Sequence, residues 1–438
     1  MHDDKLFPVG DPQPKKPRPP GTPRVQLPVR NQIEFVQCDL DSLISFDHQA
    51  RVVWTFVERT DISKLHEHIL AFEGGAGRSP IDPRVLLALW IYATLQGVGS
   101  ARQLDSLCSG HAPYRWLCGG IPVNYHTLSD FRSGSAAQFE RVLIESIAAL
   151  RSVKMVTMER VAHDGVRVRA SAGTGSFRSK ETLDVFHREA EEQVQALRQE
   201  LLDDPTAGSK RQQAARTRAA AERLEGIKKA LEQYPDVEAK KKDKKKKARV
   251  SITDPDARVM KMPNGGFNPA YNVQFSADTG SQIIVGVSVS QSGSDHALLV
   301  PAVEQIKAHS GCVPKETLAD GGFGRPESIE TLAQPPYEST VYSPPTEYKD
   351  KDGKVKEPKK DESAEKKEWR ERMKTDDAKK IYRERASTIE CVNALARNRG
   401  LQQFRVRGLE RVRAVVLLFA LAHNVARTMS LMKKALTG

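Results

Sequence analysis

The chain has 438 residues, 39% of them hydrophobic and 28% charged, and its formal net charge is +12. This length predicts two or three domains, and the composition is typical of a soluble globular protein with some charged, poorly packed stretches. The five cysteines are odd in number and form no CxxC pair, which argues against a disulfide framework or zinc finger and favours reduced thiols in a cytoplasmic protein. The positive charge predicts an anionic partner, most commonly nucleic acid.

The chain begins with a segment rich in proline and basic residues. It contains no apolar core of the kind found in a signal peptide, so residues 1–31 are predicted to form a disordered basic arm. The apolar run Ala414–Ala422 is too short to cross a bilayer and is followed by His423 and Asn424. It predicts a buried helix, and no membrane contact is expected.

Residues 32–156 follow a helical pattern, and Pro83 lies just inside the start of one predicted helix. A later segment has one apolar face, which consists of Phe139, Val142, Leu143, Ile147 and Leu150. Together these patterns predict a helical N-terminal domain. Arg102, Arg115 and Arg132 are predicted to be exposed or partly exposed. DNA binding is therefore favoured for this domain, with a purely structural helical bundle as the alternative.

The hydrophobic period changes near Arg160. Residues 161–170 contain β-branched residues that alternate after Gly165, which predicts a strand with Asp164 in its middle. Residues 183–249 return to helix-forming residues with few apolar side chains and end in a run of lysines. They predict a protruding helical hairpin, inserted into the next domain, and then a solvated lysine loop. DNA contact by the lysines is the less favoured alternative.

Strands and helices alternate in the remaining chain. Residues 257–291 predict two or three antiparallel strands that turn at Asp278–Gly280. A predicted helix, Asp295–His309, precedes a short strand that ends at Asp320, and this order predicts a mixed α/β sheet. Residues 335–380 are rich in charged residues and proline and predict a flexible or partly helical insertion. The last predicted helices are Asp377–Arg399 and Leu409–Met432.

Three acidic residues have unusual positions. Asp164 lies inside a predicted strand, Asp320 ends one, and Glu390 lies inside a predicted helix. Taken singly, each is more simply interpreted as a turn or capping residue. Carboxylates that face a sheet are costly unless they hold a cation, and three together would suit Mg²⁺ or Mn²⁺. Two such ions, roughly 4 Å apart, are the arrangement that assists phosphodiester cleavage.

The motifs around these acids resemble those of the DDE transposases of bacterial insertion sequences. They are HDGVRVRA at Asp164, LADGGFG at Asp320 and YRERASTIE at Glu390, with TDPDAR and NPAYNVQ ahead of the central strands. The segment from PRVLLALWIYATLQGVGSARQLD to YHTLSDFR also resembles the helical domain that precedes the catalytic domain in this group. The resemblance covers most of the chain outside the arm and the two insertions. It implies an RNase H-like α/β fold, a mixed sheet flanked by helices, over residues 157–182 and 250–438.

The third motif has the family's order of a tyrosine, an arginine three positions later and then the glutamate, here Tyr382, Arg385 and Glu390. In an unbroken α-helix, these offsets would place Glu390 within about 80° of Tyr382, so one helix face could present all three to DNA. The family commonly has a lysine about two turns after the glutamate. This chain has Arg397 there, which keeps the charge and changes the contact geometry.

The resemblance implies a metal-dependent DNA transposase. Asp164, Asp320 and Glu390 would be the catalytic residues and would bind Mg²⁺ or Mn²⁺, as two ions, to cut the ends of the element and transfer the strands to target DNA. Tyr382, Arg385 and Arg397 would contact the DNA. The partners expected are double-stranded DNA and a second copy of the chain, because two ends must be cut together.

Two alternatives remain open at this stage. An RNase H-type nuclease would share the acids and cleave without joining, and an inactive descendant would only regulate by binding DNA. His163 lies beside the first acid and is interpreted as a structural hydrogen-bonding residue rather than a catalytic one.

Overall fold

The structure is a computed structural model that describes residues 39–67, 69, 79–203, 209–241, 247–345 and 362–437. All the described helices and strands belong to one compact unit, Leu40–Gly438. The predicted basic arm, residues 1–31, lies outside the described residues.

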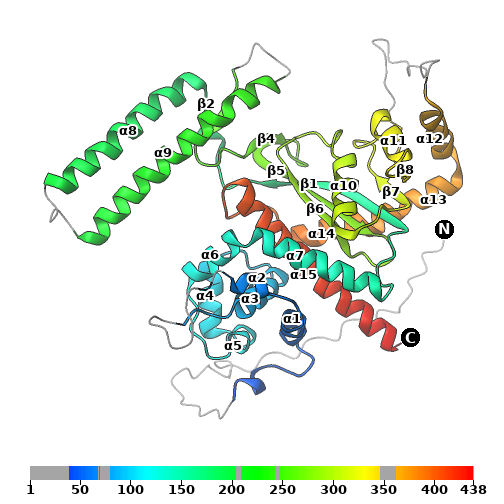
Figure 1. The fold of residues 1–438 in the computed structure, drawn as a ribbon, viewed down its shortest axis with the longest axis horizontal. Helices are drawn as coiled ribbons and strands as arrows, with labels where there is room; N and C mark the ends of the chain where they lie inside the picture. The colour runs from blue at the N-terminus through cyan, green and yellow to red at the C-terminus, as the bar shows by residue number, and fades with distance from the viewer. Residues whose placement is uncertain are drawn as a thin grey trace, which may run out of the picture. The chain divides into compact units, whose positions relative to one another are not determined.

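The described residues before the first strand are helical (Figure 1). The elements are the 3-10 turn η1 (Asp41–Leu43) and the helices α1 (Gln49–Glu58), α2 (Ser63–His66), α3 (Pro83–Leu95), α4 (Ala101–Gly110), α5 (Ala112–Cys118), α6 (Tyr125–Gly134) and α7 (Ala136–Ser152). Helix α3 is buried on nearly all sides, and the side chain of Asp82 caps its first turn. The indole of Trp90 donates to the carbonyl of Leu128, 2.9 Å away, which ties α3 to α6. The predicted helical pattern is confirmed.

Of the three arginines predicted to be exposed in this segment, Arg102 and Arg115 are exposed. The prediction is wrong for Arg132, whose side chain reaches inward from α6 and leaves the residue only 6% exposed. Its guanidinium carbon lies 4.3 Å from the centre of the Trp90 ring. Stacking on an aromatic face lets this cation enter the interior, which residue type and period alone did not indicate.

A mixed sheet forms the centre of the unit. Its strands are β1 (Arg160–Arg169), β4 (Arg258–Lys261), β5 (Phe267–Asp278), β6 (Ile284–Ser290), β7 (Glu316–Ala319) and β8 (Thr340–Tyr342). Strand β5 pairs antiparallel with β1, β4 and β6, while β7 pairs parallel with β1 and β8. The sheet therefore runs β6-β5-β1-β7-β8, with β4 on the start of β5. The strand predicted around Asp164 and the turn after Asp278 are both confirmed.

The other elements surround this sheet or extend the chain between its strands. They are the 3-10 turn η2 (Thr174–Ser176), the short strands β2 (Phe177–Arg178) and β3 (Val250–Ser251), and the helices α8 (Lys180–Asp203), α9 (Lys210–Ala239), α10 (Leu299–Ser310), α11 (Pro326–Ala333), α12 (Ala364–Lys374), α13 (Asp376–Arg385), α14 (Cys391–Asn398) and α15 (Leu409–Thr437). A π-helical turn, η3 (Ala386–Glu390), joins α13 to α14.

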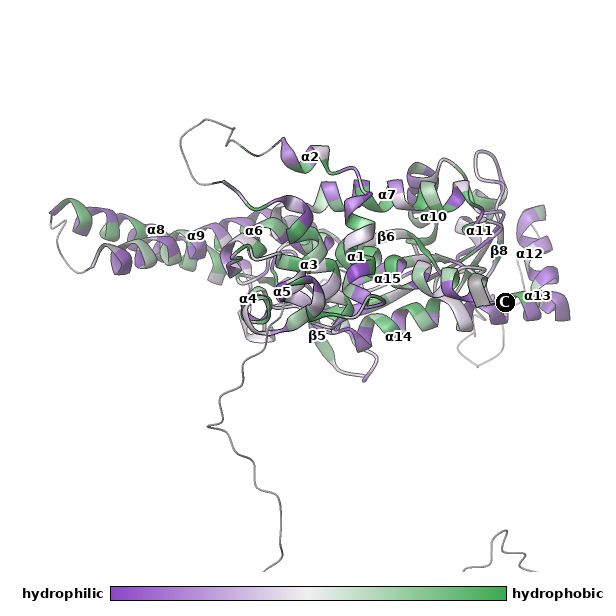
Figure 2. Cartoon of the chain, turned by 90° about the horizontal axis from the view of Figure 1, so that it is seen from below, coloured by the Kyte–Doolittle hydropathy of each residue, from purple (hydrophilic) through white to green (hydrophobic). Residues whose placement is uncertain are grey.

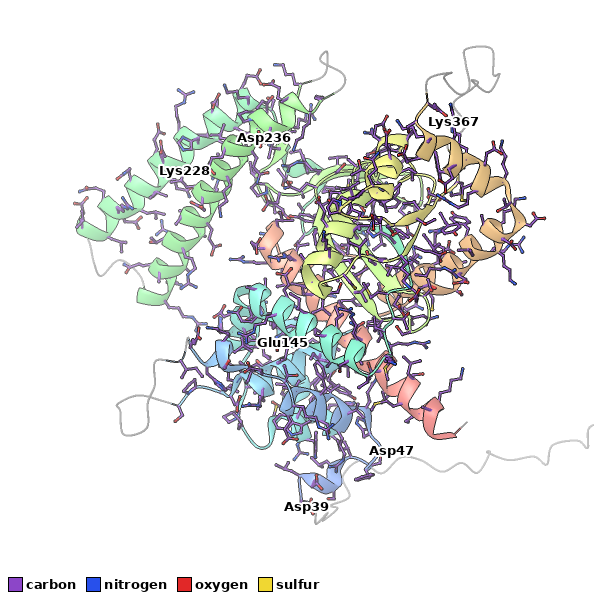
Figure 3. All side chains as sticks on the ribbon, turned by 45° about the vertical axis from the view of Figure 1, so that its right-hand side comes forward. Asp39, Asp47, Glu145, Lys228, Asp236 and Lys367 are labelled. Atoms are coloured by element: carbon purple, nitrogen blue, oxygen red, sulfur yellow. The ribbon has the colours of Figure 1, made fainter. Side chains whose placement is uncertain are left out.

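Helices α8 and α9 form the predicted hairpin. They pack on each other through a small apolar cluster of their own, which includes Leu183, Ile227 and Tyr234. Elsewhere their side chains are largely polar and exposed, as Lys228 and Asp236 show in Figure 3. Such a thin apolar stripe suffices for two helices but not for an independent domain. Most of the predicted lysine loop, residues 242–246, lies outside the described residues.

The segment 335–380, predicted to be a charged insertion, contains structural elements at both ends. Thr340–Tyr342 form β8 of the main sheet, and Trp369 of α12 is buried at 1% exposure with its indole donating to the carbonyl of Ser343. Strand β8 has three residues, which is too short to show a hydrophobic period in the sequence. Helices α12 and α13 are mostly hydrophilic (Figure 2), so the composition of this segment did not indicate that they pack on the rest of the fold. Residues 346–361 lie outside the described residues.

Helix α15 is the main apolar support of the fold. It contacts α3, α6, α7 and β6, and its residues Val412 to Ala422 are largely buried, which confirms the predicted buried helix. By length and composition, Leu409–Ala435 could also cross a membrane, and 56% of its apolar window is buried within the protein. Its start is held by two acids of the TDPDAR motif: Asp254 accepts from the amide of Gly408 and Asp256 from that of Leu409. These bonds satisfy amides that a helix leaves unpaired at its first turn.

We predict that Asn424→Ala lowers the free energy of unfolding by roughly 2–4 kcal/mol. The buried amide of Asn424 on α15 accepts from the backbone N–H of Ile284 (2.8 Å) and donates to its carbonyl (2.9 Å), so alanine would leave both groups of β6 unpaired. Denaturant unfolding measures the change. The exposed residue Asn398 provides the control variant, Asn398→Ala, which is expected to stay within about 0.5 kcal/mol of the parent chain. Equal stability of the two variants would contradict this role.

Candidate active site

Two of the three predicted acids lie at the same level of the sheet. Strands β1 and β7 are parallel, and His163 pairs with Ala319, so Asp164 and Asp320 are the next residues of two neighbouring strands. Each carboxylate accepts a hydrogen bond from the N–H of the glycine that follows it, at 2.9 Å for Asp164 and 2.8 Å for Asp320. The short strand predicted to end at Asp320 is present as β7 and ends one residue earlier, at Ala319.

The guanidinium of Arg385 connects the first acid with the third. Its Nη2 donates to Glu390 Oε1 at 2.6 Å, and its Nη1 lies 3.4 Å from Asp164 Oδ2. The side chains of Arg385 and Asp164 are 13% and 21% exposed, whereas that of Glu390 is 50% exposed. Residues far apart in the sequence therefore share one half-buried cation beside the sheet.

The charges of this cluster affect one another. Burial, and then repulsion from Asp320 and Asp295, raise the pKa of Asp164, although Arg385 and the amide of Gly165 oppose the rise. Burial alone would lower the pKa of Arg385, but Tyr382, Asp164 and Glu390 together raise it. Arg385 consequently stays charged, and it supplies the positive charge that Asp164 needs in its buried position.

Tyr382 lies against the same guanidinium. The Arg385 guanidinium carbon is 5.7 Å from the centre of the Tyr382 ring, within the range of a cation–π contact. Burial raises the pKa of the Tyr382 hydroxyl, and the nearby Asp320 adds to the rise. Tyr382, Arg385 and Glu390 are thus brought together, as the sequence predicted.

The geometric reason for this grouping differs from the prediction. Arg385 and Glu390 are five positions apart, which in an α-helix would separate their side chains by about 140° around the axis. The π-helical turn η3 lies between them and has the wider i to i+5 repeat, so both side chains lie on one side. The angle of about 80° between Tyr382 and Glu390, calculated for an unbroken α-helix, therefore does not apply.

A side chain from outside the helix supports the π-helical turn. Gln282, in the turn between β5 and β6, has a left-handed backbone (φ +59°), and its Nε2 donates to the carbonyl of Ser387 at 2.7 Å. The carbonyl of Gln282 in turn pairs with Nε2 of the buried His423 on α15 (2.9 Å). These contacts connect α15, through the β5–β6 turn, to the helix that carries Glu390.

Two polar residues of the site were missed by the sequence analysis. Asn393 of α14 is 4% exposed and donates from Nδ2 to Asp164 Oδ2 at 3.1 Å. It lies three positions after Glu390, so helical spacing could have indicated it. Asp295 accepts from Asn272 Nδ2 (2.6 Å) and from Arg167 Nη2 (3.1 Å), and no sequence signal distinguished it from an ordinary residue at the start of a helix.

Gly165 makes this crowded arrangement possible. A Cβ atom at that position would lie 2.5 Å from Gln274 Nε2, 2.9 Å from Asn272 Oδ1 and 3.0 Å from Asp295 Oδ1. These distances are too short for any side chain, so a glycine must follow Asp164 if the polar residues beneath it are to keep their hydrogen bonds.

The remaining predicted residues occupy separate positions. Arg397 is exposed on α14, and its side chain makes no hydrogen bond or ion pair with the residues that the structure describes. In the same described part of the chain, no three His, Cys, Asp or Glu side chains lie close enough together to hold one metal ion. In the structure, Arg385 is the cation between Asp164 and Glu390.

His163 is a structural residue, as the sequence analysis interpreted it. Its ring is buried, with Nδ1 2.8 Å from Ser276 Oγ and Nε2 2.9 Å from Gln274 Oε1, and it packs edge-to-face against Phe323. Burial lowers the pKa of His163 to about 4, and it lowers that of His423 on α15 to about 4 as well.

Two segments of the chain match known protein families. Residues 38–134 match the family described as "Transposase domain (DUF772)", and residues 346–429 match the family described as "Transposase DDE domain". The first match spans α1 to α6, and the second includes Tyr382, Arg385, Glu390 and Arg397. No curated protein and no solved structure matches the chain.

We predict that Gln282→Ala increases amide hydrogen exchange in residues 386–392 by roughly fivefold, because a net hydrogen bond of about 1 kcal/mol to the turn is lost. Exchange measured by mass spectrometry tests this. The matched control is Gln402→Ala, which removes a similar bond from Gln402 Nε2 to the carbonyl of Arg397 at the other end of α14. Unchanged exchange at η3 in Gln282→Ala, or equal exchange there in both variants, would refute the supporting role.

We also expect the protein to lose stability on acidification between about pH 6.5 and pH 4. The pKa of His163 is about 4 in the folded chain and about 6.5 in the unfolded chain, so the unfolded state binds the proton first. Stability is then full above pH 6.5 and is lost as the pH falls, by about 2 kcal/mol per buried histidine between pH 7 and pH 5.

The comparison of variants isolates the contribution of this histidine. His163→Gln should reduce the pH dependence of the free energy of unfolding, measured with denaturant at each pH. His126→Gln, at an exposed position, should leave the dependence unchanged. An identical pH dependence in the His163→Gln variant and the parent chain would show that His163 is not held neutral.

Proposed function

The chain is a DDE transposase of the insertion-sequence type, and from this premise we propose that it cuts the ends of a mobile DNA element and joins them to target DNA in a metal-dependent reaction. The observation that carries the proposal is the shared guanidinium of Arg385, which brings Asp164 and Glu390 together. The charge of Asp320 also raises the pKa of both Asp164 and Arg385. A group of acids around one cation, with Asp164 half-buried among them, is an arrangement suited to phosphoryl transfer.

We propose that the catalytic domain has an RNase H-like fold. In support, three antiparallel strands, β6, β5 and β1, continue into the parallel strands β7 and β8, with helices in the connections. Asp164 lies in the central strand of this sheet and Asp320 follows its parallel neighbour. The edge at which parallel strands end is a common place for ligands in such sheets.

Asp164, Asp320 and Glu390 are the residues proposed to hold divalent ions, Mg²⁺ or Mn²⁺, as a pair. The donor set fits these ions, because all three groups are carboxylates and the half-buried Asp164 already has a cation beside it. When bound, the ions would activate a water or a 3′-hydroxyl and stabilise the leaving oxygen. Since Arg385 competes for the same carboxylates, its guanidinium would have to release at least one of them.

The surrounding side chains have separate roles in this proposal. Arg385, once released, and Tyr382 beside it would bind and orient a strand phosphate. Asn393 keeps the Asp164 carboxylate in place through its 3.1 Å hydrogen bond. Arg397 is exposed on α14, the helix that follows Glu390 in the chain, and would contact the DNA backbone.

The proposed partners are double-stranded DNA, as element ends and as target, and a second copy of the chain. The net charge of +12 supports binding to DNA. The proposed location is the cytoplasm, because a bacterial protein that acts on chromosomal DNA must be there to reach it. An RNase H-type nuclease would explain the acids equally well but not the match of the helical segment, residues 38–134, to a transposase domain.

We predict that Asp164→Asn, Asp320→Asn and Glu390→Gln each reduce cleavage of labelled element ends in Mg²⁺ by roughly 10³-fold or more, because each removes a proposed metal ligand. Binding of the same DNA, measured by gel shift, should remain. The control is Asp376→Asn on α13, whose side chain is 98% exposed and pairs only with nearby Lys379 in the described structure.

The products distinguish the alternatives. Cleavage together with strand transfer supports the proposed transposition chemistry, and cleavage without joining supports a nuclease. DNA that is bound but never cut by the parent chain supports a regulator. Full activity in any of the three acid variants would overturn the assignment of that residue.

A further inference from the structure

A cavity of about 110 Å³ lies where the helical N-terminal segment meets the C-terminal helices, away from the acids of the candidate active site. Its walls combine apolar and basic residues, among them Trp90, Arg132, Arg399, Phe404, Arg405 and Phe419. None of the residues that line it is an aspartate or a glutamate. The cavity therefore gathers positive charge, and the described residues that line it include no anion to balance this charge.

Arg132 is the most deeply buried of these cations. It is 6% exposed, donates from Nη1 to the carbonyl of Gly99 at 2.8 Å, and stacks on Trp90. Its Nε has no hydrogen-bond partner in the described structure, and no carboxylate pairs with it there. Burial, followed by repulsion from Arg405, lowers the pKa of Arg132 to about 10, which still leaves the group charged at neutral pH.

The other two arginines come from the C-terminal segment. Arg399 lies at the end of α14, and its buried Nη1 has no hydrogen-bond partner among the described residues. Arg405 is exposed, and its side chain lies along Gly99, with Cδ 3.7 Å from the position that a Cβ atom would take there. Neither residue forms an ion pair with the described part of the chain.

Two glycines bring the walls of the cavity together. Gly97, after α3, has φ +71°, and Gly400, after α14, has φ +88°. A Cβ atom on Gly400 would lie 3.3 Å from the carbonyl oxygen of Gly97, so the two loops approach backbone to backbone. The arginines of both segments are held at one place by this close contact.

We propose that the cavity formed by Arg132, Arg399 and Arg405 binds a phosphate group. Burying a cation without an anion is costly, and the unpaired N–H groups of Arg132 and Arg399 would find acceptors in an oxyanion. Guanidinium groups match phosphate oxygens with paired hydrogen bonds, and the apolar walls strengthen the attraction by excluding water. The phosphate belongs either to a strand of bound DNA or to a small free phosphate.

The site is independent of the proposed cleavage chemistry. Its cations come from segments that match two different families, since Arg132 lies within residues 38–134, and Arg399 and Arg405 lie within residues 346–429. A bound phosphate would therefore connect the helical segment to the segment that carries Glu390. Loss of this site would leave Asp164, Asp320 and Glu390 unchanged.

Titration calorimetry of the full chain with inorganic phosphate, at constant ionic strength set with chloride, tests the proposal. Arg399→Gln and Arg405→Gln should each bind phosphate about tenfold more weakly than the parent chain, because each removes a charge-assisted contact. Arg411→Gln, which removes an equal charge from an exposed position of α15, should bind phosphate like the parent chain. Arg132 is left intact because its burial makes a substitution there a threat to folding.

Competition with a short DNA duplex then identifies the source of the phosphate. If inorganic phosphate weakens duplex binding by the parent chain but not by Arg399→Gln, the site takes a strand phosphate. If the chain binds phosphate and duplex at once without mutual effect, the site takes a free phosphate. No phosphate binding by the parent chain, or equal binding by Arg399→Gln, Arg405→Gln and Arg411→Gln, would overturn the proposal.

Discussion

The contact of Arg385 with both Asp164 and Glu390 is the interaction on which the site depends. A carboxylate as buried as that of Asp164 is stable only beside a positive charge, and the neighbouring Asp320 and Asp295 increase this need. The Arg385 guanidinium supplies this positive charge from α13, a helix distant from Asp164 in the sequence. A divalent ion would meet the same balance, so the proposed metal would compete with Arg385 for these carboxylates.

The rest of the fold places these groups. Strand β1 holds Asp164 between β5 and β7, and the parallel register with β7 sets Asp320 beside it. The π-helical turn η3 directs Glu390 to the side of Arg385. Helix α15 supports the sheet and η3. Its Asn424 pairs with the backbone of β6. Its His423 pairs with the carbonyl of Gln282 in the β5–β6 turn, and the side chain of Gln282 donates to η3. The apolar helix α15 therefore connects the core to η3, which sets the position of Glu390.

The sequence predicted the parts of this arrangement that depend on local pattern or on a motif. The strand around Asp164, the strand end at Asp320, helical structure around Glu390 and the buried α15 all followed from period and turn residues, although a single helix was predicted over Asp377–Arg399. It could not predict η3, since nothing in ASTIE distinguishes a π turn from an α turn. Arg132 was placed at the surface because the stacking on Trp90 is a tertiary contact, and β8 was hidden by its length of three residues.

Binding of Mn²⁺ measured by electron paramagnetic resonance tests the central claim most directly, because it does not require DNA or turnover. If Asp164, Asp320 and Glu390 form one cation site that Arg385 partly neutralises, the parent chain binds Mn²⁺, Asp164→Asn binds it at least about tenfold more weakly, and Arg385→Gln binds it at least as tightly as the parent chain. Equal Mn²⁺ affinity in the parent chain and Asp164→Asn would contradict the account.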